Sequence, residues 1–254
     1  MIVQTWEGDG YCPICEDKRT FRAESDKVIP DAFEPHWFRG KLRCLVCKSP
    51  PRERAAAHVL AKLRPDWRDL VIHESSPGGW ALSQKLRRDC NKYVATQYDP
   101  KFPFGEMHTS GRWRNENLEN QTFADEIFDI VIAQDVFEHL FNPGLAAQEI
   151  ARTLRPGGLC LLTVPVIRPW AETVRRASIS NGVVIHHMPE AYHGNPVGDG
   201  KSLVTIDWSI AIGPYLAAQS GMPFTNLLLD DMRIGVRDDA NMLLIGIKQE
   251  MPAL

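Results

Sequence analysis

The sequence predicts an α/β fold built on a largely parallel sheet, and three observations in residues 128–165 support this prediction. Residues 128–133 form a short β-branched apolar run, the composition of a strand that is buried on both faces. Asn142-Pro143, a pair typical of a helix cap and first turn, precedes small and apolar residues at helical spacing. Residues 159–164 are a second apolar strand that ends at Pro165. Such a strand–helix–strand crossover belongs to sheets whose ligands bind at the carboxyl ends of the strands.

The elements on either side of this unit fit the same class. Residues 52–64 and 80–90 have helical periodicity, and residues 70–72 and 92–96 are short apolar strands. We expect loops over residues 98–126, with a short helix or strand near 113–118. Residues 206–220 favour a helix, and 223–229 and 241–248 favour closing strands that form an antiparallel pair. The intervening segment 166–201 shows few elements, and a stretch of that length in a compact domain is usually functional or mobile.

Residues 128–165 closely resemble the middle of the class I S-adenosylmethionine-dependent methyltransferases of the large type 11 group. Four pieces of the family pattern occur in order, namely Phe128-Asp129, Glu138-His139, the turn over residues 154–158 and Val164-Pro165. The resemblance covers roughly residues 66–250. It implies a seven-stranded Rossmann-like methyltransferase sheet with helices on both faces, and S-adenosyl-L-methionine as the cofactor.

The resemblance also implies which residues form the cofactor loop after the first strand. The family has a glycine-rich loop there, because glycine lets the backbone approach the ligand. Aligned on Glu74, this sequence keeps Gly78 in register with Gly79 adjacent, and Ser76 stands in for the first glycine. The loop is degenerate, and an ordinary turn between a strand and a helix is the alternative. We expect Glu74, Ser76, Gly78 and Gly79 to bind the cofactor.

Further cofactor contacts map to the ends of later strands. Gln97 stands where the family has an acid for the ribose hydroxyls, and a glutamine can still donate and accept hydrogen bonds there. Asp99 is the alternative if the strand runs longer. The adenine contact maps to Asn117-Leu118, and Gln134-Asp135 follow the strand over residues 128–133.

The first 50 residues differ in composition and predict a separate metal-binding module. Cys12 and Cys15 form one CxxC pair, and Cys44 and Cys47 form a second. Four thiolates suit a tetrahedral, structural Zn²⁺ that has no open position for a substrate. Iron is the alternative metal, and a redox CxxC is disfavoured because neither pair opens a helix after a strand. We expect a small zinc-ribbon-like module over residues 1–50 and the methyltransferase domain over 51–254.

Two histidines are the predicted catalytic residues. Methyl transfer mainly requires the acceptor to be held in line with the methyl group, with a general base in some enzymes. His139 lies at the predicted sheet edge, and we expect the segment 166–201 to cover the acceptor site as a lid that brings His193 opposite His139. A packing role for His139 and a turn role for His193 are the alternatives. A second zinc site at His186, His187 and His193 is the least favoured option.

Composition limits the remaining classes. The chain has 254 residues, 44% hydrophobic content, a net charge of −3 and no apolar run long enough to span a membrane. Six cysteines without a basic, apolar N-terminal signal predict a cytoplasmic protein. Residues 39–64 are basic, but compensation of the thiolate charge is favoured over binding to nucleic acid.

We expect methylation of O or N on a small molecule or glycan precursor, with an RNA base methyltransferase or a non-catalytic scaffold as alternatives. The acceptor atom, any partner of the zinc module and the oligomeric state stay open.

Overall fold

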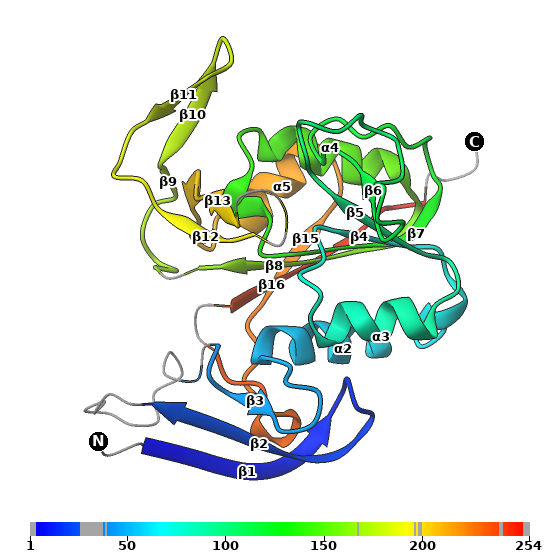
Figure 1. The fold of residues 1–254 in the computed structure, drawn as a ribbon, viewed down its shortest axis with the longest axis vertical. Coiled ribbons are helices and arrows are strands. Elements are labelled where there is room, and N and C mark those ends of the chain that lie inside the picture. The colour runs from blue at the N-terminus through cyan, green and yellow to red at the C-terminus, as the bar shows by residue number, and fades with distance from the viewer. Residues whose placement is uncertain are drawn as a thin grey trace.

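The computed structural model describes residues 4–25, 38, 40–166, 168–195, 197, 200–238 and 241–250. Its centre is a seven-stranded sheet of order β15-β16-β8-β7-β4-β5-β6 (Figure 1). The strands are β4 (Ile72–Ser75), β5 (Tyr93–Gln97), β6 (Arg114–Asn115), β7 (Phe128–Gln134), β8 (Leu154–Pro165), β15 (Phe224–Leu227) and β16 (Asn241–Ile247). The pairs among β4 to β8 are parallel, whereas β16 is antiparallel to both of its neighbours. The predicted α/β class, the seven strands and the closing antiparallel pair are confirmed.

Helices cover both faces of this sheet. Helices α2 (Pro51–Leu63) and α3 (Ala81–Asp89) lie on one face, and α4 (Pro143–Thr153) and α5 (Ile212–Ser220) lie on the other (Figure 1). Alternate residues of β7 supply the two cores, because side chains along a strand point to opposite faces. Ile130 and Ile132 belong to the cluster under α2 and α3, and Val131 and Ala133 belong to the cluster under α4 and α5.

Residues 166–201 contain more regular structure than we expected. Two antiparallel hairpins lie in or at the end of this segment, one of β10 (Ala177–Ser180) with β11 (Val183–His186) and one of β12 (Tyr192–Gly194) with β13 (Lys201–Leu203). Their strands are three or four residues long and mostly exposed, so they lack the long apolar alternation that reveals a strand in sequence.

Three local expectations are also corrected. The helix predicted from residue 206 begins at Ile212, because β14 (Ile206–Asp207) pairs with β9 (Val174–Arg175). Strand β8 begins at Leu154, well before the expected residue 159, directly after α4 ends. Asn142 precedes α4 but its side chain does not cap the helix; its Nδ2 donates to the Glu119 carboxylate at 3.1 Å instead.

The N-terminal residues form a small three-stranded sheet that packs on α2. Strand β1 (Gln4–Cys12) pairs with β2 (Asp17–Ser25), which pairs with the short β3 (Arg43–Cys44). The buried Arg54 of α2 holds this sheet to the rest of the chain, because its guanidinium donates to the carbonyls of Leu42, Ser49 and Gly235. Phe21 and other apolar side chains of the module share one hydrophobic cluster with α2, α3 and β4.

The described helices include none that combines the length and apolar character needed to cross a membrane. The part of the chain that the structure describes also contains three short 3-10 turns: η1 (Trp67–Asp69), η2 (Phe137–His139) and η3 (Met232–Ile234). Of these, η2 directly follows β7 at the carboxyl edge of the sheet. It therefore sets the position of the side chains discussed next.

Candidate functional site

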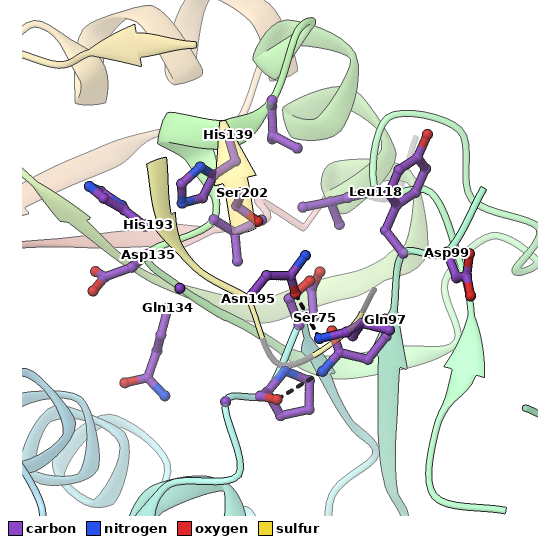
Figure 2. Close-up of a pocket in the computed structure, with 18 of the residues that line it drawn as sticks. Ser75, Gln97, Asp99, Leu118, Gln134, Asp135, His139, His193, Asn195 and Ser202 are labelled. Carbon is purple, nitrogen blue, oxygen red and sulfur yellow. Dashed lines mark hydrogen bonds between the residues drawn. The ribbon is translucent and has the colours of Figure 1, made fainter. Parts of the chain in front are cut away.

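A cavity of about 1090 Å³ opens at the carboxyl ends of β4, β5 and β7 (Figure 2). It is the site that a doubly wound sheet provides, since the strand ends and the loops after them diverge there. Its wall includes eight of the nine residues predicted to bind cofactor. They are Glu74, Ser76, Gly78, Gln97, Asn117, Leu118, Gln134 and Asp135. Gly79 is the exception; its φ of +70° turns the chain toward α3.

The acidic residue at the end of β4 is fully enclosed. Glu74 accepts hydrogen bonds from Ser83 Oγ at 2.8 Å and from the Tyr93 hydroxyl at 2.6 Å. Burial raises the pKa of its carboxyl despite these donors. Glu74 is therefore anchored from behind by α3 and β5, and it forms a fixed part of the cavity floor.

The loop after β4 is held in place by the end of β5. Gln97 is buried and its Nε2 donates to the Pro77 carbonyl at 2.8 Å. Ser76 adopts a left-handed φ of +53°, which is unusual for a residue with a side chain. A Cβ added to Gly78 would lie 2.3 Å from the Trp80 ring, so glycine is required there for packing. The degenerate loop thus keeps a tight conformation with a single in-register glycine.

The opposite wall comes from the segments after β5 and β6. Asp99 accepts a hydrogen bond from Lys101 N at 2.9 Å, and Asn117 accepts one from Glu119 N at 3.0 Å. Leu118 is 6% exposed and offers an apolar surface. Figure 2 draws Leu118 and Asp99 on the same side of the cavity, away from the two histidines. An apolar side chain between two turns with polar edges suits a planar heterocycle.

The end of β7 carries a carboxylate with two partners. Asp135 has a φ of +52°, accepts a hydrogen bond from Thr163 Oγ1 at 3.0 Å, and lies 3.1 Å from Arg52 Nε. Arg52 lies in the first turn of α2, so this helix and the sheet meet at the cavity. Gln134 beside it has an unpaired buried Oε1 among the described residues.

Sequence reasoning missed Arg52 and Glu53 as parts of this wall. Glu53 is 1% exposed, and burial raises the pKa of its carboxyl to about 7. The backbone N–H of Leu82 donates to one of its oxygens at 3.1 Å. The sequence features near these two residues were the helical periodicity of residues 52–64 and the basic composition of residues 39–64, and neither gives a direction toward the cavity.

The basic segment is largely engaged in contacts within the chain. Arg43 lies over the Trp80 ring, Arg52 faces Asp135, and Arg54 is buried against Phe21. Arg64 pairs with Asp66. These four arginines are therefore not arranged as an open anion-binding face, and compensation of the thiolate charge stays a prediction.

The two predicted catalytic histidines lie together at the other end of the cavity. The rings of His139 and His193 are perpendicular, with their centroids 5.0 Å apart. Glu138, which precedes His139 in the Glu-His motif and lies at the same sheet edge, is between them. Its Oε1 is 3.6 Å from His139 Nε2 and 3.5 Å from His193 Nδ1. His193 comes from β12, so the segment after β8 does reach this edge of the sheet.

The other histidines of that segment lie elsewhere. His186 is near the Glu190 carboxylate, and the His187 ring bonds to Ser178 Oγ at 2.9 Å. Neither belongs to a group of possible metal ligands among the described residues. A zinc site made of His186, His187 and His193 is therefore not formed in this structure.

The four cysteines of the N-terminal module converge on one point. Sγ of Cys12 lies 3.7 Å from Sγ of Cys47, and Sγ of Cys15 lies 3.9 Å from Sγ of Cys44. Two sulfurs on one tetrahedral Zn²⁺ with bonds of about 2.3 Å lie about 3.8 Å apart. The donor set and its spacing therefore fit that ion.

Comparisons with known proteins agree with the fold. Residues 74–162 match the family model described as "Methyltransferase domain". An uncharacterized methyltransferase of Mycobacterium sp. (strain JLS) is 30% identical over 174 residues, which is 61% of this chain and 65% of that protein. A ubiquinone biosynthesis O-methyltransferase of Parvibaculum lavamentivorans is 25% identical over 192 residues, covering 69% of this chain and 73% of that protein.

The fold itself also has a match among solved structures. An S-adenosylmethionine dependent methyltransferase from Mesorhizobium loti has a TM-score of 0.50 and 13% identity, over 76% of this chain and 97% of that one. The chain spans about two thirds of the length of the mycobacterial relative. The described sheet therefore has the Rossmann-like methyltransferase fold, and residues 74–162 match a methyltransferase domain.

Proposed function

We propose that this chain, whose residues 74–162 match a methyltransferase domain, transfers a methyl group from S-adenosyl-L-methionine to an oxygen or nitrogen of a small molecule or glycan precursor. One observation carries the proposal. Eight of the nine residues expected to bind cofactor and both histidines expected at the acceptor line a single cavity, although 119 positions separate Glu74 from His193. The cofactor supplies an activated methyl group when it is bound.

The two ends of the cavity have different chemistry, and this supports a division of roles. Leu118 and Asn117 would hold the adenine, and Gln97 the ribose, whose hydroxyls can donate to its Oε1. Asp135 would face the cationic end of the cofactor. One N–H of Gln97 Nε2 is bonded to the Pro77 carbonyl, so the second N–H and Oε1 would serve the ribose hydroxyls.

The acceptor would bind at the histidine end. His139 Nδ1 lies 2.8 Å from the Leu203 carbonyl, which can only accept, so Nδ1 carries the proton and Nε2 keeps a lone pair. The lone pair on His139 Nε2, or the Glu138 carboxylate, would accept the proton of an acceptor hydroxyl or amine. The hairpin of β12 and β13 would cover the acceptor and limit the entry of water.

A structural Zn²⁺ on the four cysteines would complete the N-terminal module. The sulfur spacing supports this assignment, and four thiolates fill a tetrahedral ion. Cys47 is five residues before Arg52, so an ordered metal turn would fix the start of α2 and with it the Arg52–Asp135 contact. The zinc would thus stabilise one wall of the cavity while taking no part in the reaction.

Calorimetric titration of the full chain with S-adenosylhomocysteine tests the proposal. We expect binding in the micromolar range and a melting temperature that rises with ligand concentration. Transfer of a labelled methyl group to fractionated small molecules, compared with transfer to RNA, then separates the acceptor classes. Absence of binding would favour the non-catalytic scaffold and overturn the proposal.

A further inference from the structure

We propose that Glu138, His139 and His193 form a binding site for a divalent transition-metal ion at the acceptor end of the cavity. One ligand atom from each residue lies within 4.8 Å of the others. Glu138 and His139 belong to η2 after β7, and His193 belongs to β12. The folding of the β12–β13 hairpin over the sheet edge therefore assembles the three groups.

The carboxylate of Glu138 provides the first argument. It is 1% exposed, and neither of its oxygens has a hydrogen-bond partner among the described residues. A buried carboxylate without donors is costly, and buried charges in proteins are normally paired or coordinate a metal. Its Oε1 is aimed at the nearest nitrogens of both imidazoles, so a cation placed among the three would satisfy it.

The distances provide the second argument. Oε1 lies 3.5 and 3.6 Å from the two nitrogens, which is longer than the 2.7–3.2 Å typical of a hydrogen bond. Two ligands on one tetrahedral ion with bonds of about 2.1 Å are separated by about 3.4 Å. The spacing therefore matches ligands around a shared ion more closely than a hydrogen-bonded cluster.

The surroundings of His139 provide the third argument. Metal-binding histidines usually donate the N–H of the second ring nitrogen to a carbonyl or carboxylate, which orients the first nitrogen. His139 Nδ1 donates to the Leu203 carbonyl, so Nε2 is left free to bind a cation. Thr205 fixes the neighbouring backbone, because its N–H donates to the Glu138 carbonyl at 2.7 Å. Leu203 lies in β13, which pairs with the strand that carries His193.

The donor set indicates the class of ion and of ligand. Two imidazoles and one carboxylate suit Zn²⁺, Mn²⁺, Fe²⁺ or Co²⁺, and three protein ligands leave at least one position open. This position would be open to the cavity, because His139 and His193 line it while Glu138 is buried behind them. An acceptor oxygen, such as a hydroxyl group, would occupy it.

The consequence for the reaction rests on the proposed function. A hydroxyl on the ion would have a lowered pKa and would lose its proton to solvent. Its oxygen would then form the new C–O bond as the methyl group leaves sulfur, yielding a methyl ether and S-adenosylhomocysteine. The site therefore favours O-methylation of a hydroxyl. In this case the two histidines would act as ligands of the metal ion and not as the general base.

Titration with Co²⁺ tests the inference on the full chain with zinc retained in the four-cysteine site. We expect one equivalent of Co²⁺ to give weak visible bands of an oxygen and nitrogen site, without intense sulfur charge transfer. His193→Ala changes a half-exposed side chain and should weaken Co²⁺ binding at least tenfold. Glu138→Gln keeps the side-chain shape and should do the same. His187→Ala is the matched control in the same segment and should bind as the parent does.

The site would be overturned if the parent protein did not bind Co²⁺. It would also be overturned if Glu138→Gln and His193→Ala both bound Co²⁺ as tightly as the parent does. Intense sulfur bands would show that Co²⁺ had replaced zinc at the cysteines and would also count against it. Binding of S-adenosylhomocysteine is measured on the same samples. If the metal binds but S-adenosylhomocysteine does not, the proposed function fails and the metal site stands; the reverse result removes only the metal site.

Discussion

Nε of Arg52 lies 3.1 Å from Oδ2 of Asp135, and this contact joins the start of α2 to the end of β7 at the cavity. Arg52 follows the cysteine turn of the N-terminal module, whereas Asp135 follows the central strand of the sheet. The first turn of α2, which follows the module, therefore contributes directly to the wall of the candidate site.

Asp135→Asn should weaken binding of S-adenosylhomocysteine about tenfold, or about 1.4 kcal/mol. Asparagine tolerates the φ of +52° at this position, so the change removes charge while keeping the turn. Calorimetry gives the dissociation constant. Asp207→Asn, which breaks an ion pair with Arg176 outside the cavity, is the control and should bind normally. Equal affinity in both variants would remove Asp135 from the cofactor site.

Cys44→Ser should release the one zinc ion per chain that we expect in the purified protein, because three thiolates hold zinc less tightly than four. Cys90→Ser is the control, since Cys90 is buried but lies outside the cluster. Metal analysis counts the ion. Protein purified without chelators and found free of zinc would contradict the assignment.

The loss of zinc should also loosen more than the first 50 residues. Phe21 shares a hydrophobic cluster with α2, and Arg54 of α2 bonds to the module and to the Gly235 carbonyl. We therefore expect faster amide exchange in β1, β2 and the first turns of α2, while β7 and β8 stay protected. Unchanged exchange in α2 would show that the helix is stable without the module.

Gly78→Val should abolish the rise in melting temperature with S-adenosylhomocysteine. The added carbon would meet the Trp80 ring, and both residues line the cavity, so the loop or the ring must shift into it. Gly194→Val is the matched control at the acceptor end, where an added Cβ meets nothing within 4 Å. A normal shift for Gly78→Val would show that the cofactor loop is assigned wrongly.

Because of Glu53, the free energy of unfolding of the protein should fall as pH rises toward neutrality. Burial raises the pKa of its carboxyl from 4.5 to about 7, so the folded protein holds this proton where the unfolded chain releases it. The contribution to stability is full below about pH 4.5 and is lost as pH rises through about 7, at most about 3 kcal/mol.

Melting curves of Glu53→Gln and the parent between pH 5 and 8 test this slope. The difference between the two proteins reports on Glu53 together with its electrostatic effect on the buried Glu74 carboxyl, because the charges of these two groups repel each other. We expect the melting temperature of Glu53→Gln to increase relative to that of the parent as pH rises. A difference that does not change with pH would show that Glu53 has an ordinary pKa.

His193→Ala should lower methyl transfer about 100-fold and leave the affinity for S-adenosylhomocysteine within about twofold, because His193 is at the acceptor end only. The measurement compares kcat with the dissociation constant in the same preparation. His187→Ala, also exposed and outside the cavity, should retain full transfer. A parallel loss of cofactor affinity would place His193 at the cofactor end instead.

Much of this protein was determined by local sequence patterns. The apolar runs of β7 and β8, the repeat of α4 and the paired CxxC turns each depend on residues close together in the chain. These patterns resemble those of the class I methyltransferases, and that resemblance predicts the seven-stranded sheet. Eight of the nine predicted cofactor residues line the cavity for the same reason, since each lies at or just after a strand end.

The tertiary structure decided which distant side chains meet. Glu138 is buried between His139 and His193 only because β12 and β13, too short and exposed to be recognised in sequence, fold back over η2. Arg52 reaches Asp135 because α2 packs against the sheet, which brings its first turn beside the end of β7. Such contacts depend on long-range packing of short elements, and the free energy that fixes them is spread over many residues without a periodic pattern in the chain.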